Sequence, residues 1–248
     1  MNNWHILHKK FMFDVLKLIY KSPFANILWF KWWTALYFFY WLHRFSVDLD
    51  FSLTENFGTD QIEKIKSDFF LYIQKHFFVD WWNFTIKIDW TLKNSFRFVL
   101  SYWWEKKIKI EVSSKMYDDK YEIKNLLWLQ VKIMKIEYMF AHKLCAFLSR
   151  YKSNWSIANR DLFDIDFLLQ KWFLPNDQII NLRTKNILGN LVDTQKYYQY
   201  LIEFIEKNKN IIQKNILDWL GDLVDEKQKK YVKNEMLENV LQQLSLRI

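Results

Sequence analysis

The chain has almost no glycine with which to build its turns. Only 3 of its 248 residues are Gly, whereas 14 are Trp. A chain of this length normally contains about 7% Gly, or roughly 17 residues, so the shortfall matches the number of tryptophans. Tight turns with a positive φ favour glycine or asparagine, because a Cβ atom clashes there. The composition therefore raises the question of whether many tryptophans stand at positions that belong to glycine.

The places where the tryptophans fall favour the glycine interpretation. Trp172 follows a predicted helix and is soon followed by a proline, which is the usual setting of a glycine C-cap. Asp89-Trp90 and Trp103-Trp104 lie between predicted strands, where tight turns are required. We predict that most of the 14 occupy glycine positions, as happens when a UGA codon that certain bacteria decode as glycine is translated as tryptophan. The alternative is that they are genuine core or stacking aromatics.

Hydrophobic spacing predicts a sheet followed by helices, and hence an α+β protein. Residues 45–53 alternate strictly between apolar and polar, and three later runs are typical of an antiparallel meander. From residue 137 onward helical spacing dominates. We expect a sheet region over residues 1–137 and a C-terminal helical region over 138–248. The predicted helices are 5–20, 34–42, 60–76, 137–151, 160–171, 177–188, 193–213 and 229–245, and the predicted strands are 26–30, 45–53, 84–89, 95–102, 107–113 and 128–136.

Net charge, cysteine content and the length of the apolar runs indicate which kinds of partner and site this chain could have. The net charge of +8 favours an anionic partner such as RNA or a nucleotide, although a Lys-rich sequence from an AT-biased genome is an equal alternative. The single Cys145 excludes an internal disulfide framework and a Cys-based zinc site. The longest uncharged apolar run, residues 32–42, is too short to span a bilayer. We therefore expect a cytoplasmic protein without a membrane partner.

Two carboxylates alternate on the strand predicted over residues 45–53. Asp48 and Asp50 share its polar face, about 6.5–7 Å apart along the backbone. Carboxylate and phosphate oxygens together suit divalent metals. Glu111, on a later predicted strand, is a candidate third ligand of a two-metal site for phosphoryl-type transfer, or else an ordinary solvent-facing residue.

Two further blocks flank this strand. Upstream lies Lys31-Trp32-Trp33-Thr34, which with glycine at 32 and 33 becomes a K-G-G-T turn opening a helix. Bare backbone N–H groups at such a turn cradle phosphates. Downstream, a helix carrying Lys143 is followed by Arg160-Asp161-Leu162-Phe163-Asp164.

Taken in chain order, the three blocks resemble the motifs of the nucleotidyltransferase-like AbiEii/AbiGii toxins. In that family a Gly-Gly or Gly-Ser turn is followed by a helix and a D-x-D strand, and later by a helix with a lysine and by R-D-x-x-D. The resemblance covers about residues 24–170. It departs from the family pattern at Trp32-Trp33, and at His142, where the family usually has glutamate. It implies a polymerase-beta-like nucleotidyltransferase fold with a mixed sheet.

The resemblance also implies roles for individual residues. Mg²⁺ would be bound by Asp48 and Asp50, with Glu111 as third ligand. Lys143 would neutralise the triphosphate, and Asp161 and Asp164 would face the active site or anchor Arg160. The remaining nucleotide-binding candidates are Lys31, Trp32, Trp33, Thr34 and Arg160. The alternatives without a role in catalysis are that Lys143 is a solvated helix lysine, and that Arg160, Asp161 and Asp164 form a structural network at the start of a helix.

The activity implied is Mg²⁺-dependent nucleotidyl transfer from an NTP to an RNA acceptor, with the tRNA 3′ end expected from the resemblance alone. The protein would then be the toxin of a toxin–antitoxin or abortive-infection system in phage defence, with a cognate antitoxin as partner. Two alternatives remain. One is a non-catalytic nucleotide- or RNA-binding module in which indoles fill the phosphate turn, and the other is a kinase-like phosphoryl transferase.

Overall fold

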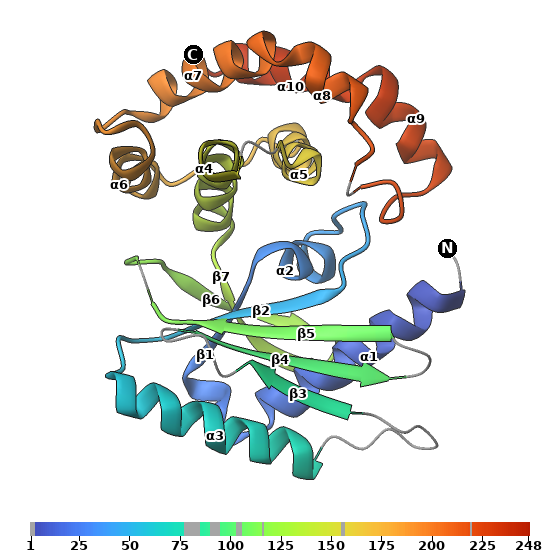
Figure 1. The fold of residues 1–248 in the computed structure, drawn as a ribbon, viewed down its shortest axis with the longest axis vertical. Coiled ribbons are helices and arrows are strands. Elements are labelled where there is room, and N and C mark those ends of the chain that lie inside the picture. The colour runs from blue at the N-terminus through green and yellow to red at the C-terminus, as the bar shows by residue number, and fades with distance from the viewer. Residues whose placement is uncertain are drawn as a thin grey trace. The chain divides into compact units, whose positions relative to one another are not determined.

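A computed structural model describes residues 3–76, 85–89, 95–102, 106–115, 117–154, 157–218 and 220–248 (Figure 1). The chain divides into two compact units. The first comprises Met1–Trp41 and Phe45–Met134, and the second comprises Leu42–Arg44 and Lys135–Ile248. The main division thus lies close to residue 137, where the hydrophobic period changes. The short segment Leu42–Arg44 belongs with the second unit although its neighbours in sequence belong with the first.

The first unit is built on a seven-stranded sheet in the order β3-β4-β5-β2-β1-β7-β6. The pairs β1–β7 and β2–β5 are parallel and the others are antiparallel, so the sheet is mixed, as predicted for a nucleotidyltransferase-type α+β protein. The strands are β1 (Leu28–Lys31), β2 (Asp48–Leu53), β3 (Thr85–Asp89), β4 (Ser95–Tyr102), β5 (Lys106–Ser113), β6 (Tyr121–Leu126) and β7 (Leu129–Met134).

One face of this sheet forms the core of the unit. Alternate residues of the central strands, such as Phe51 and Ile110, are fully buried on this face. Helix α3 (Thr59–His76) packs against it through Phe69, whose ring centroid lies 6.0 Å from that of Phe96 and 5.4 Å from that of Phe98. The unit's other helices are α1 (Asn3–Tyr20), η1 (Pro23–Asn26) and α2 (Trp32–Phe39). The opposite face carries the polar residues of the same strands.

Local patterns predicted most of these elements. The meander strands 95–102 and 107–113 and the helix at 60–76 agree with the structure to within a residue at each end. The β2 strand begins at Asp48 rather than at residue 45. The β6 strand was not predicted, because its sequence YEIKNL alternates over only four residues and none of its side chains is fully buried at the sheet edge.

The second unit is helical, as expected. Its helices are α4 (Ile136–Asn154), α5 (Asn159–Gln170), α6 (Asp177–Leu188), α7 (Thr194–Lys207), α8 (Lys209–Lys214), α9 (Glu226–Asn234) and α10 (Met236–Ser245). The helix predicted over 193–213 is divided at Asn208, and the one over 229–245 starts earlier and is divided at Glu235. Within the described residues, no helix is both long and apolar enough to cross a membrane.

Among the tryptophans that the structure describes, three adopt the left-handed backbone that favours glycine. The φ angles are 65° at Trp32, 58° at Trp41 and 57° at Trp172. At the end of α5, the Trp172 N–H donates to the Leu169 carbonyl at 3.0 Å, and the next N–H donates to the Leu168 carbonyl at 3.3 Å. These two bonds form a Schellman motif, with tryptophan at the position that glycine normally holds.

This backbone geometry supports the glycine interpretation at those three positions. A genuine glycine, Gly189 with φ of 80°, ends α6 in the same left-handed region. Trp4, Trp29, Trp33 and Trp128 are also described and do not have a positive φ, so their backbone does not call for glycine. The other seven tryptophans lie outside the described residues. For the full set of 14, the glycine interpretation stays a prediction.

We expect Trp41→Gly to raise the free energy of unfolding by about 1 kcal/mol, because a Cβ atom in the left-handed region costs about that much. Trp41 is 77% exposed, so little packing is lost with its ring. Trp41→Ala is the matched control, since it removes the same ring but keeps the Cβ atom. Urea denaturation measures both variants, and a glycine variant no more stable than the alanine variant would refute the strain argument.

Candidate functional site

A row of four charged residues crosses the polar face of the sheet. Lys31 on β1 is the Cα partner of Asp50 on β2, Asp50 is the partner of Glu111 on β5, and Glu111 is the partner of Arg97 on β4. Directly opposed residues point to the same side of a sheet, so these side chains lie along one line, with the two carboxylates of Asp50 and Glu111 adjacent and a cation at each end. Asp48, two residues before Asp50, lies on the same face.

Glu111 is engaged by Arg97. The Arg97 guanidinium donates from Nη2 at 2.8 Å and from Nε at 3.1 Å to the Glu111 Oε2 atom. Both side chains are about 40% exposed, so we regard this pair as a weak surface ion pair. Among the described residues, no three His, Cys, Asp or Glu side chains gather at a point that could hold a metal. The sheet places Glu111 beside Asp50 as expected, but it does not assemble a three-carboxylate centre.

Lys31 lies at the buried end of the row. Its Nζ atom donates to Ser113 Oγ at 2.6 Å, and the residue is 8% exposed. Burial lowers the pKa of Lys31 to about 8, although the nearby carboxylates of Asp50, Asp119 and Glu111 oppose that shift. Asp119, which is itself buried on the loop before β6, had no sequence signal to mark it. The predicted nucleotide-binding lysine is thus surrounded by acidic groups.

The first turn of α2 is fixed to the start of β2 by Thr34. The buried Thr34 hydroxyl lies 2.6 Å from Ser46 Oγ and also donates to the Asp48 carbonyl oxygen. The hydroxyl predicted to contact phosphate is therefore used to position the backbone that carries Asp48. On the same turn, the rings of Trp32 and Trp33 stack with centroids 5.7 Å apart, and the Lys31 ammonium lies 5.1 Å from the Trp32 centroid.

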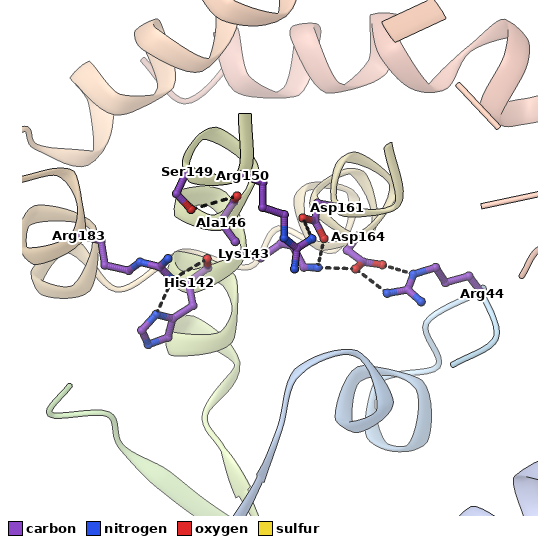
Figure 2. Close-up of polar contacts among 9 residues, drawn as sticks. All are labelled: Arg44, His142, Lys143, Ala146, Ser149, Arg150, Asp161, Asp164 and Arg183. Carbon is purple, nitrogen blue, oxygen red and sulfur yellow. Dashed lines mark hydrogen bonds and ion pairs between the residues drawn. The ribbon is translucent and has the colours of Figure 1, made fainter. Parts of the chain in front are cut away.

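In the second unit, Lys143 is the centre of a buried ion cluster (Figure 2). Its Nζ atom lies 2.6 Å from Asp161 Oδ1 and 2.8 Å from Asp164 Oδ2, and all three side chains are at most 1% exposed. Asp161 and Asp164 are one helical turn apart on α5, which places them side by side against Lys143 on α4. The structure thus brings the lysine of the predicted lysine helix together with the two carboxylates of the R-D-x-x-D block, and Lys143 is not a solvated helix lysine.

Two arginines that were not predicted complete this cluster. Arg44 binds Asp164 with two parallel bonds, from Nε to Oδ1 at 2.6 Å and from Nη2 to Oδ2 at 2.7 Å. Arg150 donates to Asp161 Oδ2. Burial disfavours the charged form of Asp164, but Arg44 and Lys143 outweigh this and hold its pKa below the ordinary value. The described contacts of the two carboxylates therefore go to these cations rather than to Arg160, whose anchoring was one of the two roles expected for them.

The sequence contains a local signal for Arg150 but none for Arg44. Arg150 lies seven residues after Lys143 on the same helix, so a two-turn spacing could have placed both on one face. Arg44 is 120 residues away from Asp164 in sequence, and no local pattern connects the two.

The second D-x-D of the chain does not form a carboxylate pair. Asp166 follows Asp164 by two positions, but on a helix this spacing turns the two side chains apart. Asp166 accepts hydrogen bonds from Tyr231 Oη at 2.8 Å and from Asn239 Nδ2 at 2.6 Å. Asp166 thereby links α5 to α9 and α10 by hydrogen bonds.

His142, at the position where the family usually has glutamate, contacts Arg183 of α6. The Arg183 Nη1 atom lies 3.0 Å from His142 Nδ1 and 3.1 Å from the His142 carbonyl oxygen. Since a guanidinium only donates, Nδ1 accepts, and the ring proton is on Nε2. A buried residue that binds α6 in this way has a packing role in this chain (Figure 2).

Comparison with known proteins identifies one family. The family model described as nucleotidyl transferase AbiEii toxin of type IV toxin–antitoxin systems matches residues 14–238. No curated protein sequence matches the chain.

Several solved structures share the fold. A putative nucleotidyltransferase from H. pylori has a TM-score of 0.59 at 20% identity, covering 100% of this chain and 99% of its own. JHP933 from Helicobacter pylori has a TM-score of 0.58 at 20% identity, covering 100% and 96%. MenT4, the nucleotidyltransferase toxin Rv2826c from Mycobacterium tuberculosis H37Rv, has a TM-score of 0.52 at 15% identity, covering 77% and 67%.

We expect Lys143→Met to lower the free energy of unfolding by about 3 kcal/mol, because it leaves two buried carboxylates without one of their cations. Lys152→Met is the matched control on the same helix, since Lys152 is exposed and its Nζ atom donates to the Ile187 carbonyl oxygen. Denaturant unfolding of both variants compares the two losses. Equal losses would show that the cluster contributes no more than a surface contact.

Proposed function

The chain belongs to the AbiEii nucleotidyl transferase toxin family, and we propose that it transfers a nucleotidyl group from an NTP to an RNA acceptor in a Mg²⁺-dependent reaction. The observation that carries the proposal is the placement of Asp48 and Asp50 on one polar sheet face, next to the turn that opens α2. The acceptor we propose is the 3′ end of tRNA, and the expected partner is a cognate antitoxin.

Asp48 and Asp50 fit the chemistry of a magnesium site. Mg²⁺ is usually held by one or two carboxylates together with substrate phosphates rather than by a cage of protein ligands alone. Two carboxylates without a third acid are therefore enough, and Glu111 would join them only by leaving Arg97. When bound, Mg²⁺ would stabilise the charge that develops on the phosphoryl oxygens.

We also assign roles to the other charged residues of the predicted site. We assign Lys31 and the backbone of residues 32–34 to binding of the triphosphate, with Thr34 holding the turn in place. We assign Lys143 to neutralising the charge on the triphosphate or the leaving pyrophosphate, with Asp161 and Asp164 keeping its ammonium in position. Arg160 stays a proposed nucleotide contact on the first turn of α5.

One observation favours a second function, that of a binding module without catalysis. The stacked rings of Trp32 and Trp33 stand on the turn where the phosphates would bind. If both are genuine, the indoles reduce the space for a triphosphate. A kinase-like phosphoryl transferase would instead be recognised by its product, which gains phosphate and not a nucleoside monophosphate.

Incubation of the glycine-restored protein with α-labelled NTPs and total tRNA tests the main proposal. We expect label to move to the tRNA, and Asp48→Asn to reduce the rate by about 10²-fold or more, since a charged group that acts in the transition state is lost. Glu122→Gln on β6 of the same sheet is the matched control. No transfer, or equal transfer by the Asp48 and Glu122 variants, would contradict the assignment.

Replacing Trp32 and Trp33 together by glycine is expected to tighten NTP binding at least tenfold over the sequence as printed, because it removes the strained Cβ at 32 and both rings from the turn. Calorimetric titration with a non-hydrolysable NTP measures the affinity. Trp128→Gly, which removes a ring from the β6–β7 turn, is the control. Equal affinities for the double variant and the printed sequence would refute the blocked-turn idea.

The pH dependence of transfer follows from Lys143. Burial lowers the pKa of Lys143 to about 8, against the opposing effect of Asp161 and Asp164. If the reaction requires the charged ammonium, kcat/KM is expected to fall tenfold per pH unit above about pH 8, since kcat/KM reports the free enzyme. A profile that stays flat to pH 9.5 would show that the proton on Lys143 is not needed.

A further inference from the structure

Arg44 belongs to the ion cluster of Lys143 although it comes from another part of the sequence. It lies in the segment Leu42–Arg44, which packs with the helical unit. Its side chain is 3% exposed and that of Asp164 is fully buried. A buried guanidinium is stable only when it is paired with an opposite charge and its N–H groups are hydrogen-bonded. The two parallel hydrogen bonds from Arg44 to the Asp164 carboxylate meet both conditions.

We propose that Arg44 is a positioning residue for the nucleotidyl transfer, acting on the Lys143 ammonium through Asp164. The proposal rests on the proposed function, because it gives Lys143 a part in the reaction. Asp164 Oδ2 accepts from both cations, at 2.7 Å from Arg44 Nη2 and at 2.8 Å from Lys143 Nζ. Figure 2 shows Asp164 lying between the two cations.

The shared carboxylate explains how Arg44 can act without touching a substrate. Asp164 is held in a fixed orientation by two bonds on the side of Arg44, which sets the place of the oxygen that Lys143 contacts. Arg150 donates to the Oδ2 atom of Asp161, while Lys143 contacts the Oδ1 atom of the same carboxylate. The ammonium of Lys143 is therefore placed by two carboxylates, each fixed by its own guanidinium.

Arg44 also lies close in sequence to the proposed metal ligands. Only three residues separate it from Asp48, the first residue of β2 and a proposed metal ligand. A sequence segment that begins in the Lys143 cluster thus continues directly into the D-x-D strand. A change at position 44 is expected to affect the lysine cluster and not the hydrogen bonds of Thr34 to Ser46 and Asp48.

The charges that face Lys143 are Asp161 and Asp164 from α5, Arg44 from the 42–44 segment, and Arg150 beyond Asp161. The positive charge of Arg44 is one cause of the lowered pKa of Lys143, after burial. Removing that charge in Arg44→Gln is expected to move the titration of Lys143 to higher pH. Arg44→Lys keeps a charge but cannot form two parallel bonds, so it is expected to leave the titration midpoint near that of the wild type.

The test combines NMR and kinetics on the full chain. Carbon-13 NMR of labelled lysines follows the titration of Lys143, with Lys143→Arg identifying its signal, and α-labelled NTP with tRNA gives kcat. We expect Arg44→Gln to shift the midpoint upward and to lower kcat by about 10²-fold, the usual loss for a misplaced catalytic group. Arg44→Lys should recover part of kcat. Arg183→Gln, which removes the guanidinium that contacts His142, controls for general loosening of the unit.

A double variant guards against simple misfolding. Arg44→Gln with Asp164→Asn removes both charges and leaves an amide pair in the same space. If Arg44 acts through Asp164, the double variant should lose no more than twofold in kcat beyond Asp164→Asn alone. Losses that multiply, or a folded Arg44→Gln protein with unchanged midpoint and kcat, would overturn the proposal. If the wild type transfers no nucleotide, the proposed function fails and the NMR midpoint alone decides whether Arg44 and Lys143 are coupled.

Discussion

The free-energy cost of burying charge is the constraint on which the helical unit depends. Lys143, Asp161 and Asp164 are almost completely removed from solvent, and each would be strongly destabilising without its partners. The contacts of Arg44 and Arg150 are therefore part of the requirement for folding. The same arrangement fixes an ammonium group in a site shielded from solvent, where charge–charge interactions are stronger than in water.

In the first unit, the pairing of the strands is the constraint that positions the charged residues. The register places Lys31, Asp50, Glu111 and Arg97 in one row, because each is directly opposite the next across the sheet. The alternate residues of the same strands supply the core on the other face, so the pattern that buries Phe51 also presents Asp50. Thr34 then ties the turn before α2 to the backbone of Asp48. A single pattern of alternation thus determines both packing and the polar face.

The sequence could predict what depends on local spacing. The alternation around Asp48 and Asp50, the spacing of Asp161 and Asp164 and the pairing of β4 with β5 were all local signals. Contacts between distant segments were not, which is why Arg44 and Asp119 were missed. The β6 strand was missed because an edge strand needs little hydrophobic alternation. The left-handed backbone at Trp32 and Trp172 could be inferred only because tryptophan is so unusual at turn and helix-end positions.

We propose above that this protein transfers a nucleoside monophosphate to RNA. The most direct measurement is the intact mass of a purified tRNA after incubation with the glycine-restored protein, Mg²⁺ and one NTP at a time. We predict that the RNA gains the mass of one or more nucleoside monophosphates, and that Asp48→Asn prevents the gain. An unchanged mass with every NTP, or a gain of phosphate alone, would contradict it.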